Sequence, residues 1–397
     1  MPVPGGVTAA RGFLAAGVAV GIKPEGRDLA LIFSTRMSSG AAVFTRNRVQ
    51  AAPVILSRKH LKLSGGRMQA ILLNSGCANA CTGKQGMRDA ILSARTLATR
   101  LGLDAHRVLV ASTGVIGVRL PLAKLLAGIP SAIDALSRRG GTAAIRAIMT
   151  TDTREKVVAV EGRLAGKPVR IGGMAKGAGM IHPNLATMLS VITTDAGVRP
   201  SQLDRILRQV VERTFHCLTV DGDTSTNDTV ILIANGASGA SIDRRCAAQF
   251  EEGLEIVCGE LARQIARDGE GATKLVEILV RGARTFKEAR CVGKAIAVSP
   301  LVKTALYGEE LNWGRILCAA GYSGVRFNPD RVRLKLNAIP IFGNGAGVKS
   351  TYPRAVSALK SREIRLELDL RAGRCSARIW TCDLSHRYID INASYIS

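Results

Sequence analysis

The sequence predicts a protein of mixed α and β structure. Short apolar runs rich in β-branched residues predict strands at residues 28–33, 69–73, 107–111, 169–171, 189–194, 229–234, 276–280, 364–368 and 377–380. Apolar side chains at helical spacing predict helices at residues 84–102, 201–215 and about 250–266. These elements do not form a regular βαβ repeat, so we expect a mixed α/β (α+β) class.

Local signals support several of these elements. In the helix at 201–215, Ser201 is a suitable N-cap, and the apolar residues Leu203, Ile206, Leu207 and Val210 share one face. Residues 162–168 contain Ala165-Gly-Lys between two extended runs, which predicts a hairpin turn. The run at 107–111 is followed by Ser-Thr-Gly-Val-Ile-Gly, which indicates a strand that ends in a turn.

Length and composition describe a globular protein. The chain has 397 residues, of which 47% are hydrophobic and 22% charged, enough to bury a large core in one or two domains. The formal net charge of +24 is of a kind often found in proteins that bind nucleic acid. However, the Lys and Arg residues are dispersed, aromatic residues are only 4%, and no zinc-finger or RNA-binding motif is present. We therefore expect a basic surface that attracts acidic metabolites and no nucleic-acid partner.

Cysteines and histidines give no metal or cofactor signal. The nine cysteines include no Cys-x-x-Cys, and Cys77 and Cys81 have no matching second pair of ligands. We expect free thiols in a reducing compartment, no metal and no cofactor. No run of eighteen apolar residues predicts a membrane span, and the first twenty residues lack a signal-peptide core. A cytoplasmic protein without a membrane partner is the default expectation.

The segment from Lys176 to Leu189 carries the most specific chemistry. Pro183 and Asn184 favour a tight turn, and the small Ala186 leaves its carbonyl open to attack by the Thr187 hydroxyl. Such an attack would form an ester, and water would then release a new N-terminal threonine. The freed α-amine, with a pKa near ~7.7–8.0 in model peptides, can act as the base for its own hydroxyl. The same residues also suit an ordinary turn before a strand.

Further motifs follow one another along the whole chain. They begin at Gly6-Val-Thr-Ala and include Asn74-Ser-Gly-Cys-Ala-Asn-Ala-Cys-Thr-Gly, Ser112-Thr-Gly-Val-Ile-Gly, Thr150-Thr-Asp-Thr, Lys176-Gly-Ala-Gly-Met, Pro183-Asn-Leu-Ala-Thr-Met-Leu, Val220-Asp-Gly-Asp-Thr-Ser-Thr-Asn-Asp, Asp268-Gly-Glu-Gly-Ala-Thr-Lys, Asn312-Trp-Gly-Arg and Ile391-Asn-Ala-Ser-Tyr-Ile-Ser. In this order the motifs resemble the glutamate N-acetyltransferase (ornithine acetyltransferase) family of arginine biosynthesis.

The resemblance implies an architecture. It implies a layered αββα-type sandwich with an N-terminal-nucleophile-like site, followed by a smaller C-terminal α/β domain that closes over the site. A slight change in composition near Gly282–Gly293 places the boundary between them, so we expect the domains at residues 1–285 and 286–397. The resemblance also implies self-cleavage between Ala186 and Thr187 into an α chain, 1–186, and a β chain, 187–397. Two copies of each chain, an α2β2 assembly, are the expected state.

The resemblance also implies the site residues. Thr187 would be nucleophile and, through its amine, base, while Thr113 and Gly114 would form the oxyanion hole. The implied substrate-binding residues are Thr153, Lys176, Thr187, Glu270, Asn392 and Ser397. Lys176 suits a carboxylate and Glu270 an ammonium group. Because Asn392 and Ser397 are close to the C-terminus, we expect the tail to fold over the site. The acidic loop Val220–Asp228 lacks calcium-loop spacing, so we expect it to support the site without metal.

The implied reaction is a ping-pong transfer through acetyl-Thr187, from N-acetylornithine to glutamate. The resemblance leaves open whether acetyl-CoA also serves as a donor, and whether the pathway is arginine synthesis or a specialised one. An N-terminal-nucleophile amidase or aminopeptidase on the same scaffold is the alternative. His182, which precedes Pro183, is a candidate for tuning the pH of self-cleavage.

Overall fold

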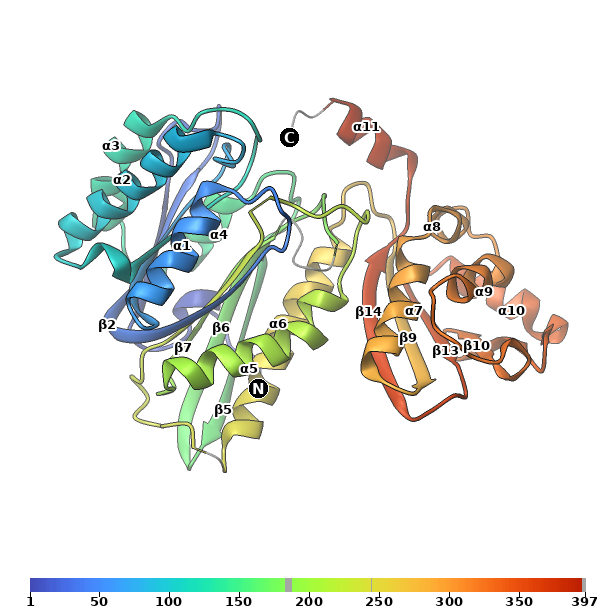
Figure 1. Cartoon of the computed structure of the whole chain (residues 1–397). Helices are drawn as coiled ribbons and strands as arrows, with labels where there is room; N and C mark the ends of the chain where they lie inside the picture. Colours follow the sequence, from blue (N-terminus) through green and yellow to red (C-terminus); the bar gives the residue numbers. More distant parts are fainter. Residues whose placement is uncertain (183–187, 244, 395–397) are drawn as a thin grey trace.

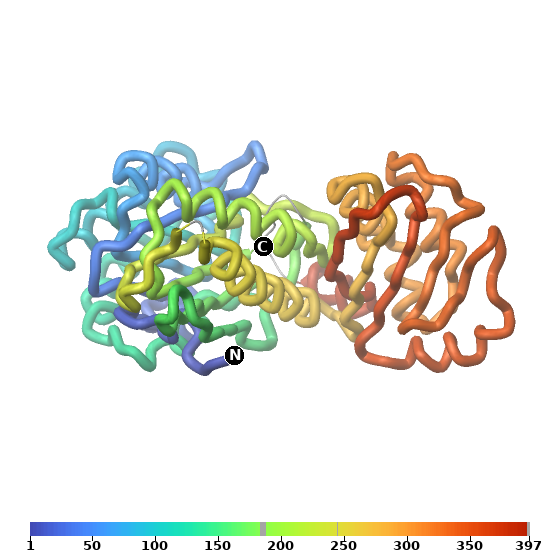
Figure 2. Tube along the Cα trace, turned by 90° about the horizontal axis from the view of Figure 1, so that it is seen from below, coloured from blue at the N-terminus to red at the C-terminus, as the bar shows by residue number. Residues whose placement is uncertain are grey.

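Two β-sheets organise the chain, an eight-stranded sheet built by residues before 235 and a six-stranded sheet built by residues after 274 (Figure 1). The computed structural model describes residues 1–182, 188–243 and 245–394. Figure 2 shows the second sheet and its helices beside the first body rather than on top of it. The mixed α and β class expected from the sequence is confirmed.

The first sheet bends about one long strand, β2. Its strands are β1 (Phe13–Val18), β2 (Leu29–Phe44), β3 (Arg67–Asn74), β4 (Val108–Ser112), β5 (Lys156–Leu164), β6 (Lys167–Lys176), β7 (Leu189–Thr194) and β8 (Thr229–Ala234). The first half of β2 pairs with β1 and β3, and its second half pairs with β8. The register of β2 against β3 shifts between Phe33 and Ser38. One strand therefore belongs to two layers.

Helices cover both outer faces of these two layers. The helices α1 (Ala52–Leu63), α2 (Gly83–Leu101) and α3 (Leu122–Asp134) pack on the outside of β2, β3 and β4, where Leu31 and Leu72 point outward. The helices α5 (Pro200–Arg213) and α6 (Ala247–Arg267) pack on the outside of β6, β7 and β8.

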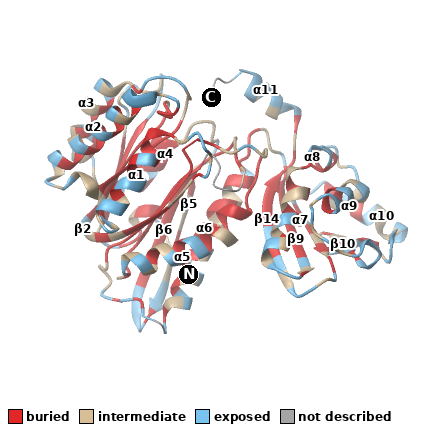
Figure 3. Ribbon diagram, viewed as in Figure 1, coloured by how far each residue is buried: buried red, intermediate tan, exposed pale blue. Residues whose placement is uncertain are grey.

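Alternate residues of the same strands fill the space between the layers. Ile32 and Leu73 meet Val191 and Ile231 there, as expected because successive strand residues face opposite sides. Helix α4 (Gly141–Ile148) enters this inner core from one side. Figure 3 shows the resulting pattern, with buried strands between partly exposed helices. The predicted αββα layering is confirmed.

The strand β7, which follows the predicted cleavage point, is central. It runs antiparallel to β6 and parallel to β8, with Leu189 opposite Thr229. All six residues of β7 are buried, so the strand end is held on a rigid element. The predicted hairpin is also present, because Leu164 pairs with Lys167 across a turn in which Ala165 and Gly166 have φ values of +48° and +77°.

The second sheet has the order β12-β11-β10-β13-β9-β14. Its strands are β9 (Leu275–Ala283), β10 (Arg333–Leu336), β11 (Ile339–Gly343), β12 (Ala346–Gly347), β13 (Glu363–Asp369) and β14 (Cys375–Cys382). The helices of this part are α7 (Phe286–Val298), α8 (Pro300–Tyr307), α9 (Trp313–Gly321) and α10 (Tyr352–Leu359), and they share one apolar core with the sheet. Because β9 belongs to this sheet, the sheet starts at Leu275. The expected domain boundary at residue 286 stays a prediction.

The last helix, α11 (His386–Ser394), leaves the second sheet and returns to the first body (Figure 1). None of its residues 386–394 is buried. It is attached by polar contacts. The Ser385 hydroxyl donates to the Gly271 carbonyl at 2.6 Å, Tyr388 Oη lies 3.3 Å from Asp221, and Asn392 binds Glu270. In the described part of the chain, no helix has the length and hydropathy of a membrane span.

Candidate active site

Several segments distant in sequence meet at a cavity of about 60 Å³. Its walls are Ala78, Thr113, Gly114, Ile116, Thr150, Thr151, Lys176, Gly179, Met180, Ser225, Asn227, Glu270 and Asn392. Five of the residues expected in the site, Thr113, Gly114, Lys176, Glu270 and Asn392, are therefore brought together. Ala186, Thr187 and Ser397 lie outside the described residues.

The turn after β4 offers two donors. Gly114 has a φ of +124°, and a Cβ there would lie 2.4 Å from the Gly76 carbonyl carbon, so only glycine fits. Among the described residues, the Gly114 N–H donates no hydrogen bond. The Thr113 N–H is already used, because it donates to the Asn74 carbonyl at 3.0 Å. The Thr113 hydroxyl and the Gly114 N–H are thus the groups suited to bind an oxyanion.

Lys176, the last residue of β6, lies behind this turn and is 2% exposed. Its ammonium group donates to Thr150 Oγ1 at 2.7 Å and to Thr113 Oγ1 at 3.3 Å. Because Thr113 Oγ1 accepts from Lys176, its own proton is left to donate into the cavity. Burial lowers the pKa of Lys176, and the nearby carboxylate of Asp152 opposes that shift.

A buried ion-pair network supports Lys176. Lys156 Nζ lies 2.6 Å from Asp152 Oδ1 and 2.6 Å from Asp268 Oδ2, and its side chain is 1% exposed. Asp152 Oδ1 also accepts the Gly177 N–H at 2.6 Å, and its other oxygen lies 3.9 Å from Lys176 Nζ. Burial alone would raise the pKa of Asp152, but the ammonium groups of Lys176 and Lys156 outweigh it and lower that pKa. The network fixes the end of β6 and the direction of Lys176.

Thr153 lies beside this cavity rather than in its wall. Its hydroxyl donates to Asp268 Oδ1, and its N–H donates to Asp268 Oδ2 at 3.0 Å. Thr153 lines an adjoining groove of about 670 Å³, and Thr151 and Glu270 line both spaces. The sequence motifs contained Asp152 and Asp268 but gave no sign of their link through Lys156.

Glu270 stands where the cavity meets the C-terminal helix. Its carboxylate accepts a hydrogen bond from Asn392 Nδ2 at 2.9 Å, and its N–H donates to the Ala178 carbonyl at 2.9 Å. The backbone at Gly179 approaches closely, because a Cβ there would lie 2.1 Å from Glu270 Oε2. The tail therefore reaches the site through Asn392, as expected.

The acidic loop after Val220 holds neighbouring segments in place. Asp221 accepts the N–H groups of Met180 and Ile181 at 2.6 and 2.8 Å. The Asn227 amide donates to the carbonyls of Ala78 and Ser112 at 2.6 and 2.8 Å. These contacts fit the supporting role expected of the loop. Within residues 1–182, 188–243 and 245–394, no three His, Cys, Asp or Glu side chains gather as a set of metal ligands.

His182 is half-buried near the undescribed segment. Burial, reinforced by the charge of Lys294, lowers the pKa of His182 to about 4. The imidazole is therefore neutral from pH 5 to 8. This finding speaks against the expected role of His182 in tuning self-cleavage within that range.

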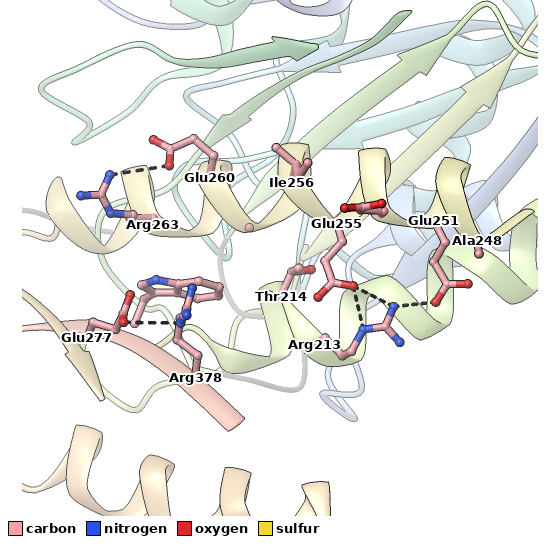
Figure 4. Close-up of a pocket in the computed structure, with 13 residues that line it drawn as sticks. Arg213, Thr214, Ala248, Glu251, Glu255, Ile256, Glu260, Arg263, Glu277 and Arg378 are labelled. Atoms are coloured by element: carbon pink, nitrogen blue, oxygen red, sulfur yellow. Dashed lines mark hydrogen bonds and ion pairs between the residues drawn. The ribbon is translucent and has the colours of Figure 1, made fainter. Parts of the chain in front are cut away.

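A larger groove of about 810 Å³ lies elsewhere, between α6 and β14 (Figure 4). Most of its charged side chains form ion pairs. Arg213 lies 2.5 Å from Glu251 and 2.8 Å from Glu255, and Arg378 lies 3.4 Å from Glu277. It contains none of the expected site residues.

A model of the ArgJ family matches residues 14–397. The chain belongs to the ArgJ family. The "Arginine biosynthesis bifunctional protein ArgJ" of Symbiobacterium thermophilum is 48% identical over 397 residues, with 98% of each chain covered. The protein of the same name from Caldanaerobacter subterraneus subsp. tengcongensis is 48% identical, with 97% of each chain covered. The chain is thus an enzyme of a family whose curated relatives are named for arginine biosynthesis.

Solved structures are also similar. The crystal structure of the arginine biosynthesis bifunctional protein ArgJ from Bacillus halodurans is 38% identical, with a TM-score of 0.49, and the match covers 51% of this chain and 97% of that one. The ornithine acetyltransferase from Mycobacterium tuberculosis, solved with ornithine, is 42% identical, with a TM-score of 0.43, and the match covers 48% of this chain and 99% of that one.

Proposed function

We propose that the chain is a self-processing acetyltransferase of arginine biosynthesis, which moves an acetyl group from N-acetylornithine to glutamate. The family membership supports the reaction class. The observation that carries the proposal is the single cavity where the Thr113 hydroxyl, the Gly114 N–H, Lys176, Glu270 and Asn392 meet.

Self-cleavage is the first proposed step. The Thr187 hydroxyl attacks the Ala186 carbonyl, the C–N bond breaks, and the acyl group moves to oxygen as an ester. Water then hydrolyses this ester and leaves a carboxylate on Ala186 and an amine on Thr187. The new amine lies next to the hydroxyl that it must deprotonate.

Acetyl transfer uses the same hydroxyl twice. Thr187 Oγ attacks the amide carbonyl of N-acetylornithine, its proton passes through the α-amine to the leaving nitrogen, and ornithine departs. The amine of glutamate then attacks acetyl-Thr187, and the released Oγ regains a proton. Both tetrahedral intermediates carry an oxyanion, for which Thr113 Oγ and Gly114 N–H are the proposed donors, with an effect of roughly 10²–10³ in kcat per donor.

Substrate recognition follows from the charges around the cavity. The buried ammonium group of Lys176 suits the α-carboxylate that both substrates share. The carboxylate of Glu270 suits the side-chain ammonium group of ornithine. We place Thr153, Asn392 and Ser397 as hydrogen-bonding partners of the substrates, in line with the family resemblance. An α2β2 assembly in the cytoplasm without nucleic-acid or membrane partners completes the proposal.

Intact mass spectrometry under denaturing conditions, combined with an acetyl-transfer assay, tests the proposal. We expect two fragments, 1–186 and 187–397, from the wild type. Thr187→Ala should give one uncut and inactive chain, and Thr187→Ser should retain part of both activities. Uncut wild type that transfers acetyl groups at full rate would overturn the proposal.

The assay also separates transfer from hydrolysis. N-acetylornithine is incubated with and without glutamate, and free acetate and N-acetylglutamate are measured. Acetate release that is independent of glutamate would indicate an amidase. Acetyl-CoA with glutamate, in a third reaction, tests for a second donor.

A further inference from the structure

Arginine side chains line the groove of about 670 Å³ that adjoins the catalytic cavity, here called the arginine groove. They are Arg154, Arg267, Arg362 and Arg387. Arg267 forms an ion pair with Glu363. Across the part of the chain that the structure describes, the other three side chains form no ion pair. The groove therefore holds positive charges that the described residues leave without a counter-charge.

Most of the carboxylates in the arginine groove are already compensated. Asp268 lies 2.6 Å from the ammonium group of Lys156, and Glu363 binds Arg267. Glu270 differs, because no ion pair to it exists among the described residues. Without its internal pairs, the groove thus presents guanidinium groups beside a single carboxylate, that of Glu270.

Two of the arginines are held against the segment that carries Glu270. The Arg154 N–H donates to Asp268 Oδ2 at 3.3 Å. The second residue of α11 is Arg387, and a Cβ at Gly271 would lie 2.9 Å from its carbonyl carbon. Residues on both sides of Glu270 therefore contact the backbones of Arg154 and Arg387, whose side chains line the groove.

The proposed reaction requires positive charge at this place. Both substrates present an α-carboxylate to Lys176, so both side chains extend toward Glu270. The ammonium group of ornithine is attracted there, whereas the side-chain carboxylate of glutamate meets a like charge. Guanidinium groups remove this conflict, because arginine binds a carboxylate through two parallel N–H···O bonds.

We propose that Arg154 and Arg387 determine acceptor specificity: their guanidinium groups bind the side-chain carboxylate of glutamate where the cavity meets the arginine groove. The inference rests on the proposed function, because it takes glutamate as the acetyl acceptor. Thr151 and Glu270 line both spaces, so a side chain that extends past them from the cavity enters the groove. Glu270 then serves the cationic donor, and the two arginines serve the anionic acceptor.

Steady-state kinetics of Arg154→Gln and Arg387→Gln test the inference. Both arginines are exposed, so the substitutions should leave the fold intact. We expect kcat/KM for glutamate to fall about tenfold in each variant, since a charge-assisted pair with the substrate is lost. The value for N-acetylornithine should not fall, because its side chain is cationic. Equal falls for both substrates, or an unchanged value for glutamate, would overturn the inference.

Arg362→Gln is the matched control. Arg362 is also exposed and lines the same groove, but it is anchored on the second sheet, where its carbonyl accepts the Leu275 N–H at 2.9 Å. The substitution removes the same charge from the groove. We expect less than about a twofold change in kcat/KM for glutamate, because solvent and salt screen a charge that does not contact the substrate. A fall as large as that of Arg154→Gln would overturn the assignment to individual arginines.

A change of acceptor provides a second measurement on the same variants. Glutamine has the size of glutamate but no charge on its side chain. The ratio of kcat/KM for glutamate to that for glutamine should therefore fall about tenfold in Arg154→Gln and in Arg387→Gln. An unchanged ratio would show that neither guanidinium group binds the carboxylate.

Failure of the proposed function gives a different result. If the wild type forms no N-acetylglutamate from N-acetylornithine and glutamate, the proposed function fails and the inference fails with it. If the wild type acetylates glutamate and both variants do so equally well, the proposed function stands and only the role of Arg154 and Arg387 is excluded.

Discussion

Lys156→Met removes the cation at the centre of the buried network while keeping a side chain of similar shape. Lys156 joins Asp152 and Asp268, whose side chains are 0% and 5% exposed, at 2.6 Å each. The substitution leaves both carboxylates in place. Asp152 then keeps only the more distant Lys176, at 3.9 Å, as a cationic partner.

The cost follows from the burial of the orphaned charges. Removing one partner of a buried ion pair costs about 3–5 kcal/mol, because the remaining charge is desolvated without compensation. This is a large part of the 5–15 kcal/mol that typically separates folded from unfolded states. At roughly 2–4 °C per kcal/mol, the melting temperature should fall by roughly 6–20 °C.

Thermal denaturation followed by circular dichroism at pH 7 measures this loss. Lys335→Met is the control, because Lys335 is 43% exposed and lies 3.7 Å from Glu367, a surface pair worth at most about 1 kcal/mol. A loss below about 1 kcal/mol for Lys156→Met, similar to the control, would refute the reasoning.

The same variant has a predicted pH dependence. The folded-state pKa of Asp152 is lowered, so its stabilising contribution is present above the unfolded pKa of ~3.9 and is lost as pH falls through the folded value. Without Lys156 the carboxylate takes up a proton at higher pH. The stability gap between wild type and variant should therefore be widest near pH 7 and should narrow as the pH approaches 4.

Three further predictions concern single side chains. Glu270→Gln keeps a hydrogen-bond partner for Asn392 but removes the negative charge. In steady-state kinetics, KM for N-acetylornithine should therefore rise about tenfold, with a smaller change in kcat. An unchanged KM would exclude Glu270 as the partner of the ornithine ammonium group. Burial lowers the pKa of His216 to about 4, although the carboxylate of Glu212 opposes that shift. As the pH falls, the unfolded state therefore takes up a proton at this side chain before the folded state does, and the stability of the folded state decreases below pH ~6.5. In urea titrations from pH 7 to pH 5, His216→Gln should lose about 2 kcal/mol less than the wild type, and equal losses would contradict this. His182→Ala should cleave itself at an unchanged rate from pH 5 to 8, and a pH-dependent difference in the mass-spectrometric time course would restore the tuning role.

The fold was predictable where burial alone decides the structure. The strands β7 and β8 have the limits expected from the sequence, because all residues in both are buried and both runs are rich in β-branched residues. The strand β2 is longer than expected, since five of the six residues Ser34–Ser39 are polar and the extension of the strand depends on pairing with β8. Helix α4 and strand β1 were not predicted, because their small residues gain stability from packing between the layers.

The candidate site was predictable only through its motifs. The family resemblance predicted that Thr113, Lys176 and Glu270 belong to one site, and in the structure all three line the same cavity. The ion pair between Lys156 and Asp268 joins residues that are 112 positions apart in the sequence, and no local sequence pattern predicts it.

The order of the strands has a consequence for handling the enzyme. The strand β7 lies between β6 and β8, and β8 also pairs with β2, so segments before and after residues 183–187 interleave in one sheet. A break in the covalent chain there leaves these ladders intact. Both pieces should elute as one particle in gel filtration and separate only in denaturant, and refolding from separately produced halves would require the sheet to be assembled anew.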